Sequence, residues 1–141
     1  MKINQISVFL ENKFGRLNEI LAILSEENIK IVAATVADTS EYGILRLLTS
    51  DQQRAYSLLK GSNVSANLSE VIAIAIEPCI GSFSSAVSYF TKAGIDIEYM
   101  YCFSLNGKAM LVLRTNNIAA AYDVIRKNNM NYMKEEDMMG L

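Results

Sequence analysis

The sequence has 141 residues, a formal net charge of −2 and no histidine. This length allows one domain or two very small ones, and an apolar fraction of 51% with 20% charged residues is typical of a globular chain. The small negative charge argues against a nucleic-acid-binding face or a basic membrane-binding patch, and catalytic triads and zinc sites that depend on histidine are excluded.

Targeting signals and metal motifs are not visible in the sequence. The amino terminus lacks the long apolar core of a signal peptide, and no apolar run approaches the roughly 18 residues of a membrane span. Cys79 and Cys102 have neither zinc nor redox spacing, so we expect two reduced, partly buried thiols. We therefore expect a cytoplasmic protein with no cofactor, no bound metal and no membrane association.

The first half of the chain predicts a strand, a helix, two strands, a helix and a short strand. Apolar residues alternate along 6–10, which is the pattern of a half-buried strand. After a loop that ends at Gly15, apolar residues follow the i, i+3, i+4, i+7 spacing of a helix; they are Leu17, Ile20, Leu21 and Leu24. The remaining elements are expected at 29–37, 43–49, 52–60 and 64–68.

The second half repeats the first at an offset of 66 residues. Identical residues pair Ile6 with Ile72, Glu11 with Glu77, Gly15 with Gly81, Ile29 with Ile95, Ile31 with Ile97, Leu45 with Leu111, Leu47 with Leu113, Thr49 with Thr115, Ala55 and Tyr56 with Ala121 and Tyr122, and Asn63 with Asn129. The same order of elements is therefore expected again, at 72–76, after Gly81, and at 95–103, 109–115, 118–127 and 130–133. Asn106-Gly107 is a strong hairpin signal between two of these strands.

This order predicts an α+β protein made of two tandem ferredoxin-like βαββαβ units, each an antiparallel sheet with both helices on one face. We expect the units at 1–69 and 70–141, the second ending in a short acidic, methionine-containing tail, and we expect them to pack edge to edge or helix layer to helix layer. In the tail, a short helix should pack Met138, Met139 and Leu141 against the body.

The ferredoxin-like fold serves many functions, so the loops must discriminate among them. A heavy-metal chaperone would need two cysteines between the first strand and the first helix, where this chain has at most Cys79. An RNA-binding module would show basic and aromatic residues on its third strand, whereas 44–48 and 110–114 are mainly aliphatic. Arg16 alone is a weak match to an acylphosphatase-like phosphate loop.

The two loops resemble the first-strand loop of the ACT domain, a small-molecule-binding regulatory module of amino-acid metabolism. The first copy reads Glu11-Asn12-Lys13-Phe14-Gly15-Arg16-Leu17 and the second spans 77–83. Gly94-Ile95-Asp96-Ile97 is similar to the family's Gly-Ile-Asn-Ile signature, and Thr39-Ser40-Glu41 resembles a stretch of aspartokinase ACT repeats. Phe14 and Ile80 replace the usual proline of the loop.

The resemblance implies a free amino acid bound between the first loop of one repeat and the second strand of the other. Helix N–H groups after Gly15 and Gly81 suit the carboxylate, and side-chain oxygens suit the ammonium. The predicted ligand-binding residues are Asn12, Lys13, Phe14, Gly15, Arg16, Leu17, Asp38, Thr39, Ser40, Gly81, Ser82, Asp96, Ile97 and Tyr99. The first loop is polar and basic, so we expect it to be the better carboxylate site.

The sequence therefore predicts a non-catalytic, amino-acid-binding regulator or sensor that acts through an unidentified protein partner. The main alternative is a structural or protein-interaction module with degenerate pockets, which would respond to no amino acid. An enzyme that uses Cys79 as its nucleophile is a further alternative, although no base is visible near this residue. An open strand edge at either end of the sheet would favour a homodimer.

Overall fold

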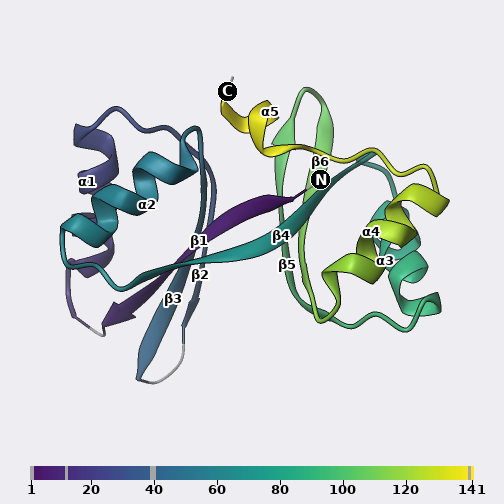
Figure 1. Ribbon diagram of the computed structural model, residues 1–141, viewed down its shortest axis with the longest axis horizontal. Coiled ribbons are helices and arrows are strands. Elements are labelled where there is room, and N and C mark those ends of the chain that lie inside the picture. Colours follow the sequence, from purple (N-terminus) through teal and green to yellow (C-terminus); the bar gives the residue numbers. More distant parts are fainter. Residues whose placement is uncertain (1, 12, 39–40, 140) are drawn as a thin grey trace. The chain divides into compact units, whose positions relative to one another are not determined.

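The computed structural model describes residues 2–11, 13–38, 41–139 and 141 (Figure 1). The first half contains β1 (Ile3–Glu11), α1 (Arg16–Glu26), β2 (Ile31–Asp38), β3 (Tyr42–Thr49) and α2 (Gln52–Gly61). The second half contains β4 (Ala66–Ile76), α3 (Ser82–Lys92), β5 (Ile97–Leu105), β6 (Lys108–Thr115), α4 (Ile118–Lys127) and α5 (Glu135–Met139). The predicted order of strand, helix, strand, strand and helix is confirmed in both halves.

The chain divides into two compact units. Residues 4–69 and 136–141 form the first unit, and residues 1–3 and 70–135 form the second. The division near the middle of the chain therefore falls between Ser69 and Glu70, and most of the carboxy-terminal tail groups with the first unit.

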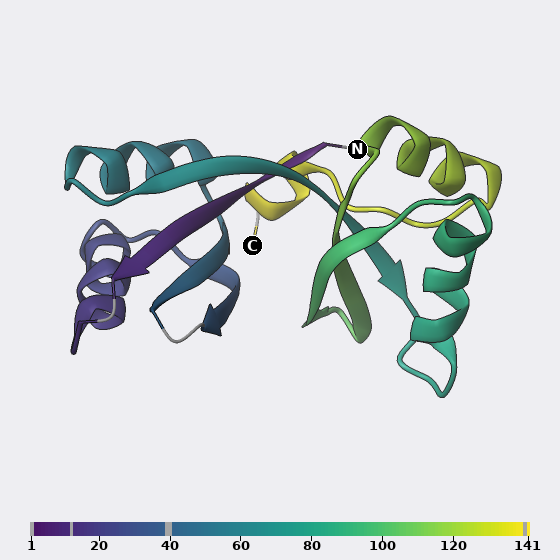
Figure 2. The same cartoon turned by 90° about the horizontal axis from the view of Figure 1, so that it is seen from below.

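The boundary between the units falls inside β4, so residues 66–69 belong to the first unit and residues 70–76 to the second. The first unit has the strand order β2-β3-β1-β4, with β3 antiparallel to both of its neighbours. Residues at alternate positions of β1 and β3 point to one face, where they are fully or almost fully buried; they include Ile6, Val8, Leu10, Leu45 and Leu47. The buried stripe of α1 and α2 packs on them through Ile20, Leu24, Ala55 and Leu59. Figures 1 and 2 show both helices on the same side of these strands, as the helical and strand periodicities predict.

The second unit repeats this arrangement with the order β4-β6-β5, again antiparallel around β6. Its core contains Ile72, Ile74, Leu111 and Leu113 from the strands and Ala86, Phe90, Ala121 and Ile125 from the helices. α3 and α4 cover one face of the strands (Figure 2). The predicted antiparallel sheet with both helices on one face is therefore observed in each unit.

Two strand boundaries differ from the sequence-based expectation. The strands expected at 64–68 and 72–76 are one strand, β4, because the intervening residues 69–71 contain no glycine or proline that would favour a turn. The strand expected at 130–133 is reduced to an isolated bridge between Ile74 and Tyr132. Hydrogen bonds from the Ala75 N–H to the Asn131 carbonyl and from the Met133 N–H to the Ala73 carbonyl flank this bridge.

The tail forms the expected short helix, α5, but only part of its expected packing. Met138 is fully buried, whereas Met139 is 63% exposed, so the expectation that both methionines pack against the body is wrong for Met139. Consecutive residues of a helix point about 100° apart, so a single turn cannot bury both of them against one surface.

A polar network holds α4 to the strands of the second unit. The Tyr122 hydroxyl donates to the Glu70 carboxylate at 2.6 Å, and Arg114 donates to the Glu70 carbonyl at 2.7 Å. The Arg114 guanidinium also lies 3.9 Å from the Glu98 carboxylate. Burial and the hydrogen bond to Glu70 raise the pKa of the Tyr122 phenol well above its ordinary value, so Tyr122 remains the donor of this bond.

A buried glutamine joins α2 to the sheet of the first unit. The Gln52 Oε1 accepts from the Thr49 N–H at 2.9 Å and from the Thr49 hydroxyl at 2.7 Å. Its Nε2 donates to the carbonyl oxygens of Asn4 and Leu47. All of these buried polar groups are therefore paired. In the second unit an isoleucine, at position 118, takes the place of the glutamine.

We predict that Gln52→Ala lowers the free energy of unfolding by about 2–3 kcal/mol, because it leaves several buried polar groups unpaired. Urea unfolding with linear extrapolation measures this loss. Gln53→Ala is the matched control, since Gln53 is an exposed neighbour on the same helix and should change stability by less than about 0.5 kcal/mol. Equal losses in the two variants would contradict the account.

Candidate functional site

In each unit a left-handed glycine links the first strand to the first helix. Gly15 is the N-cap of α1 with a φ of 81°, and Gly81 is the N-cap of α3 with a φ of 86°. A Cβ added at either glycine would meet no described atom within 4 Å. Glycine is therefore favoured at both positions by its positive φ and not by crowding within the chain.

The backbone of the two loops makes the same hydrogen bonds. In the first loop the Lys13 N–H donates to the Glu11 carbonyl at 2.7 Å, and the Arg16 N–H donates to the Lys13 carbonyl at 3.2 Å. The matching bonds of the second loop run from the Cys79 N–H to Glu77 and from the Ser82 N–H to Cys79, at 2.9 and 3.2 Å. Each backbone hydrogen bond of the first loop therefore has an equivalent in the second loop, 66 residues later.

The starts of α1 and α3 differ from those of the other two long helices. At α2 the Asp51 side chain accepts from the Arg54 N–H, and at α4 the Asn117 side chain accepts from the Ala120 N–H. Gly15 and Gly81 have no side chain with which to cap α1 and α3. The first N–H groups of a helix lack partners within the helix and carry a partial positive charge, so these two starts suit an anion.

Around the first loop, exposed and cationic side chains surround the start of α1. Phe14 is fully exposed, Leu17 is 38% exposed, and Lys13 is exposed. The Arg16 guanidinium lies 3.3 Å from the Glu19 carboxylate, yet its Nε is buried and has no hydrogen-bond partner among the described residues. The residues around the start of α1 therefore include an exposed ammonium and a guanidinium that is paired with Glu19.

Three of the predicted site residues, Asn12, Thr39 and Ser40, lie outside the described residues. Asp38 is exposed and ends β2, where it pairs with Gly43 of β3. Gly43 in turn pairs with Leu10 of β1. The structure therefore brings Asp38 to the same end of the first unit's sheet as the loop that carries Lys13 to Leu17.

Around the second loop, apolar side chains line an open hollow of about 890 Å³. Its lining residues are Pro78, Cys79, Ile80, Phe83 and Ala109. Ile80 is fully exposed, and the Cys79 thiol lies 2.8 Å from the Ser82 hydroxyl. Ile80 and Phe83 were not predicted as site residues, although the offset of 66 from Phe14 and Leu17 would have identified them.

The predicted site residues of the second unit form two separate groups. Gly81 and Ser82 begin α3, whereas the other group follows the end of α3 and consists of Asp96, Ile97 and Tyr99. The second unit therefore does not bring these two groups together. The Asp96 N–H donates to the Asn116 side chain at 3.2 Å, and Ile97 packs on the helical core. A register shift between Ile97 and Tyr99 turns the tyrosine to the opposite face of the sheet. Asp96 and Ile97 also border a separate cavity of about 290 Å³.

The cysteines and the acidic side chains decide which further chemistry the chain offers. Both Cys79 and Cys102 are free, and both are exposed, so the expectation of partial burial is wrong. Cys102 is exposed because β5 lies at the edge of its sheet.

Among the described residues, no group of three or more cysteine and acidic side chains is placed to hold a metal ion. In the same residues, no helix is long and apolar enough to cross a membrane.

We predict that Gly15→Ala and Gly81→Ala each lower the free energy of unfolding by about 1 kcal/mol, because alanine is disfavoured at positive φ. Gly15→Asn should cost less, since asparagines 28, 63, 106 and 129 of this chain already adopt positive φ. Urea unfolding of the three variants measures the difference. Equal costs for alanine and asparagine at position 15 would show that φ is not the constraint.

Comparisons with known proteins agree with the duplicated fold. The sequence matches the family described as "ACT domain pair" over residues 1–141. The crystal structure of protein BT0572 from Bacteroides thetaiotaomicron is similar, with 33% identity and a TM-score of 0.94 over 100% of this chain and 98% of that chain. No curated protein sequence matches the chain.

Two further solved structures share the fold at low sequence identity. The regulatory subunit of aspartate kinase from Thermus thermophilus, in its ligand-free form, is 13% identical with a TM-score of 0.56 over 88% of this chain and 91% of that chain. The regulatory subunit of aspartate kinase from Thermus flavus is 14% identical with a TM-score of 0.57 over 90% of this chain and 94% of that chain. These likenesses confirm the predicted tandem ferredoxin-like fold.

Proposed function

Because the chain belongs to the family of ACT domain pairs, we propose that it is a non-catalytic regulator that binds a free amino acid at the loops preceding α1 and α3. One observation carries the proposal: each loop opens a helix with a left-handed glycine and no side-chain cap. The family is a regulatory module without a catalytic domain. Solved relatives of the same fold include regulatory subunits of aspartate kinase.

The α-carboxylate of the ligand would bind at the helix start. Backbone N–H groups in the first turn and the positive end of the helix dipole both favour a carboxylate there. At the first loop, the Arg16 side chain is 21% exposed and its guanidinium pairs with Glu19, and its exposed N–H groups would donate charge-assisted hydrogen bonds to a carboxylate. Lys13 adds a second, exposed positive charge. These features favour the first loop as the stronger carboxylate site.

The ammonium and the side chain of the ligand need different surroundings. Asp38 provides a carboxylate at the same end of the first unit's sheet as the loop and would accept from the ammonium. At the second loop, the apolar hollow beside Ile80 and Phe83 suits an apolar side chain. Contributions from Asn12, Thr39 and Ser40, and from Asp96, Ile97 and Tyr99 of the other repeat, remain predictions, as does a ligand position between the repeats.

The runner-up function is a protein-interaction module with degenerate pockets. The observation in its favour is the full exposure of Phe14 and Ile80, two large apolar side chains at equivalent loop positions. Burying such side chains against a protein partner would be favourable. This module would show no response to any amino acid, which separates it from the leading proposal.

A regulator without a catalytic domain must act through another molecule. We propose that the protein forms a homodimer. We also propose that an unidentified protein partner binds its ligand-bound and ligand-free forms with different affinities. β2 is the edge strand of the first unit and β5 that of the second, so both present backbone groups that a second copy could pair with.

We predict that one of the twenty amino acids, screened at millimolar concentration, raises the melting temperature. A ligand at 100 times its dissociation constant adds about 2.7 kcal/mol of stability, a shift of several degrees. Arg16→Gln should reduce the shift, whereas Arg54→Gln, which removes a half-exposed arginine paired with Glu27 at the other end of α1 from the loop, should not. Asp96→Asn tests the contribution of the other repeat.

A screen in which no amino acid changes the melting temperature would contradict the proposal and favour the interaction module. A shift that is equal in the wild type and in Arg16→Gln, with unchanged affinity by calorimetry, would remove the first loop from the site. Calorimetry of Gly81→Ala then tests the second loop separately, because Gly81 is the N-cap of α3 and lies outside the first loop.

A further inference from the structure

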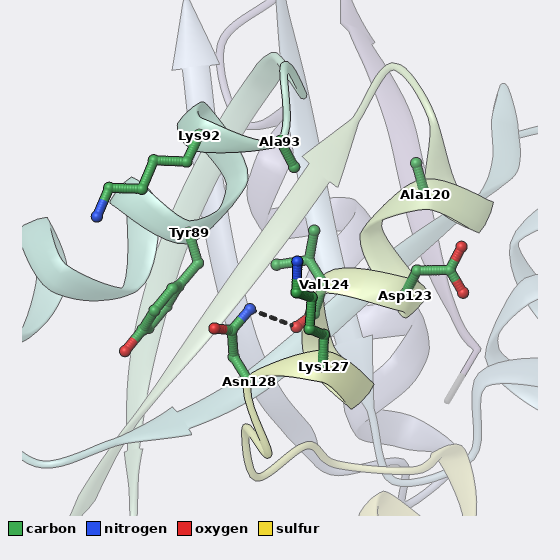
Figure 3. Close-up of a pocket in the computed structure, with 8 residues that line it drawn as sticks. All are labelled: Tyr89, Lys92, Ala93, Ala120, Asp123, Val124, Lys127 and Asn128. Carbon is green, nitrogen blue, oxygen red and sulfur yellow. Dashed lines mark hydrogen bonds between the residues drawn. The ribbon is translucent and has the colours of Figure 1, made fainter.

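The second unit contains a pocket on its helical layer, away from the loop that precedes α3. It lies between α3 and α4 and has a volume of about 380 Å³ (Figure 3). The lining residues are Tyr89, Lys92 and Ala93 from α3 and its end, and Ala120, Asp123, Val124, Lys127 and Asn128 from α4 and its end. This volume is in the range of small-molecule sites, which begins at about 300 Å³.

The pocket exists because an ion pair of the first unit has no counterpart in the second. In the first unit, the Arg54 guanidinium bridges the two helices to the Glu27 carboxylate at 3.1 Å. The offset of 66 residues places Ala93 and Ala120 at these two positions. Two long charged side chains are thus replaced by methyl groups, and the space that the ion pair fills in the first unit is left open in the second.

The charge of the pocket is positive. Among the residues that the structure describes, neither Lys92 nor Lys127 lies within 4.0 Å of a carboxylate. The acidic residue of the lining, Asp123, is paired with Arg126 at 3.0 Å. In the first unit the equivalents of the two lysines are Glu26 and Gly61, so the positive charge belongs to this copy alone.

The remaining lining is suited to an apolar, flat body. Tyr89 is 38% exposed and lines the α3 side together with Ala93, while Ala120 and Val124 line the α4 side (Figure 3). In the same view Lys127 reaches back across Val124 toward the middle of the pocket. Asn128 donates to the Val124 carbonyl at 2.9 Å, which holds its side chain in place.

We propose that this pocket binds a small organic anion that has one carboxylate and a compact apolar body, and that lacks an ammonium group. The body stacks on Tyr89 and fills the space above Ala93 and Ala120, and the carboxylate pairs with Lys127. The Lys92 side chain extends away from Lys127 (Figure 3) and adds positive charge at the rim. A free amino acid is disfavoured, because its ammonium would add a second positive charge close to the Lys127 ammonium. The site is therefore independent of the amino-acid site proposed at the loops.

Nuclear magnetic resonance titration of the whole chain tests the proposal, with 3-phenylpropanoate as the probe. We expect saturable shifts of the backbone amides of 89–93 and 120–128. The neutral 3-phenylpropanamide and the zwitterion phenylalanine should bind there at least about fivefold more weakly, since each lacks net negative charge. Shifts of equal size and saturation for the acid and its amide would overturn the proposal, as would no shift at about 20 mM probe.

Variants of the pocket separate the charge from the cavity. Lys127→Gln should weaken phenylpropanoate binding about fivefold, whereas Lys60→Gln, a change in the last turn of α2, should leave it unchanged. The double variant Ala93→Glu/Ala120→Arg rebuilds the ion pair of the first unit and should abolish binding while the amide spectrum elsewhere stays that of the folded protein. Wild-type affinity in Lys127→Gln or in the double variant would contradict the proposal.

Discussion

The positive φ at the N-cap glycine of the first helix in each unit governs both the packing and the chemistry of that unit. With φ values of 81° at Gly15 and 86° at Gly81, the chain leaves a strand and enters a helix that packs on the same sheet. Side-chain N-caps ordinarily require φ and ψ in the β region, as at Asp51 and Asn117. The turn that returns the helix to the sheet therefore excludes a side-chain cap. Since the loop carbonyls of Lys13 and Cys79 already accept from the first N–H of each helix, the next N–H groups of the first turn are the ones left for another acceptor.

Duplication leaves two copies of this scaffold with different polar chemistry. The first copy carries Arg16 beside its helix start, where the second carries Ser82. The helix layers differ as well, because the Glu27–Arg54 ion pair of the first unit is replaced by two alanines in the second. The cores, by contrast, keep the same positions apolar in both copies. Binding properties can thus diverge between the copies without a change in the fold.

Much of the fold was predictable because its signals are local and repeated. Alternation at Ile6, Val8 and Leu10 and helical spacing at Ile20 and Leu24 are confirmed by their burial. The unbroken course of β4 was not predicted, because residues 69–71 separate two apolar stretches without showing whether the chain turns there. The exposure of Cys102 follows from its position on an edge strand, which depends on the order of strands and not on the local sequence.

The candidate site was harder to predict than the fold. The glycines and the loops were identified, since the repeat marks them twice, and the left-handed geometry follows from glycine at that position. The hollow beside Ile80 and the pocket between α3 and α4 were missed, because a cavity arises from side chains that are short or absent. In the sequence, the pocket between α3 and α4 is indicated only when Ala93 and Ala120 are compared with their equivalents, Glu27 and Arg54.

The central claim is that the uncapped helix starts bind the carboxylate of an amino acid. A crystal structure of the chain with the amino acid that most raises its melting temperature tests this claim most directly. The account predicts ligand carboxylate oxygens about 3 Å from backbone nitrogens in the first turn of α1 or α3. A ligand bound elsewhere, with both helix starts free of it, would contradict the claim.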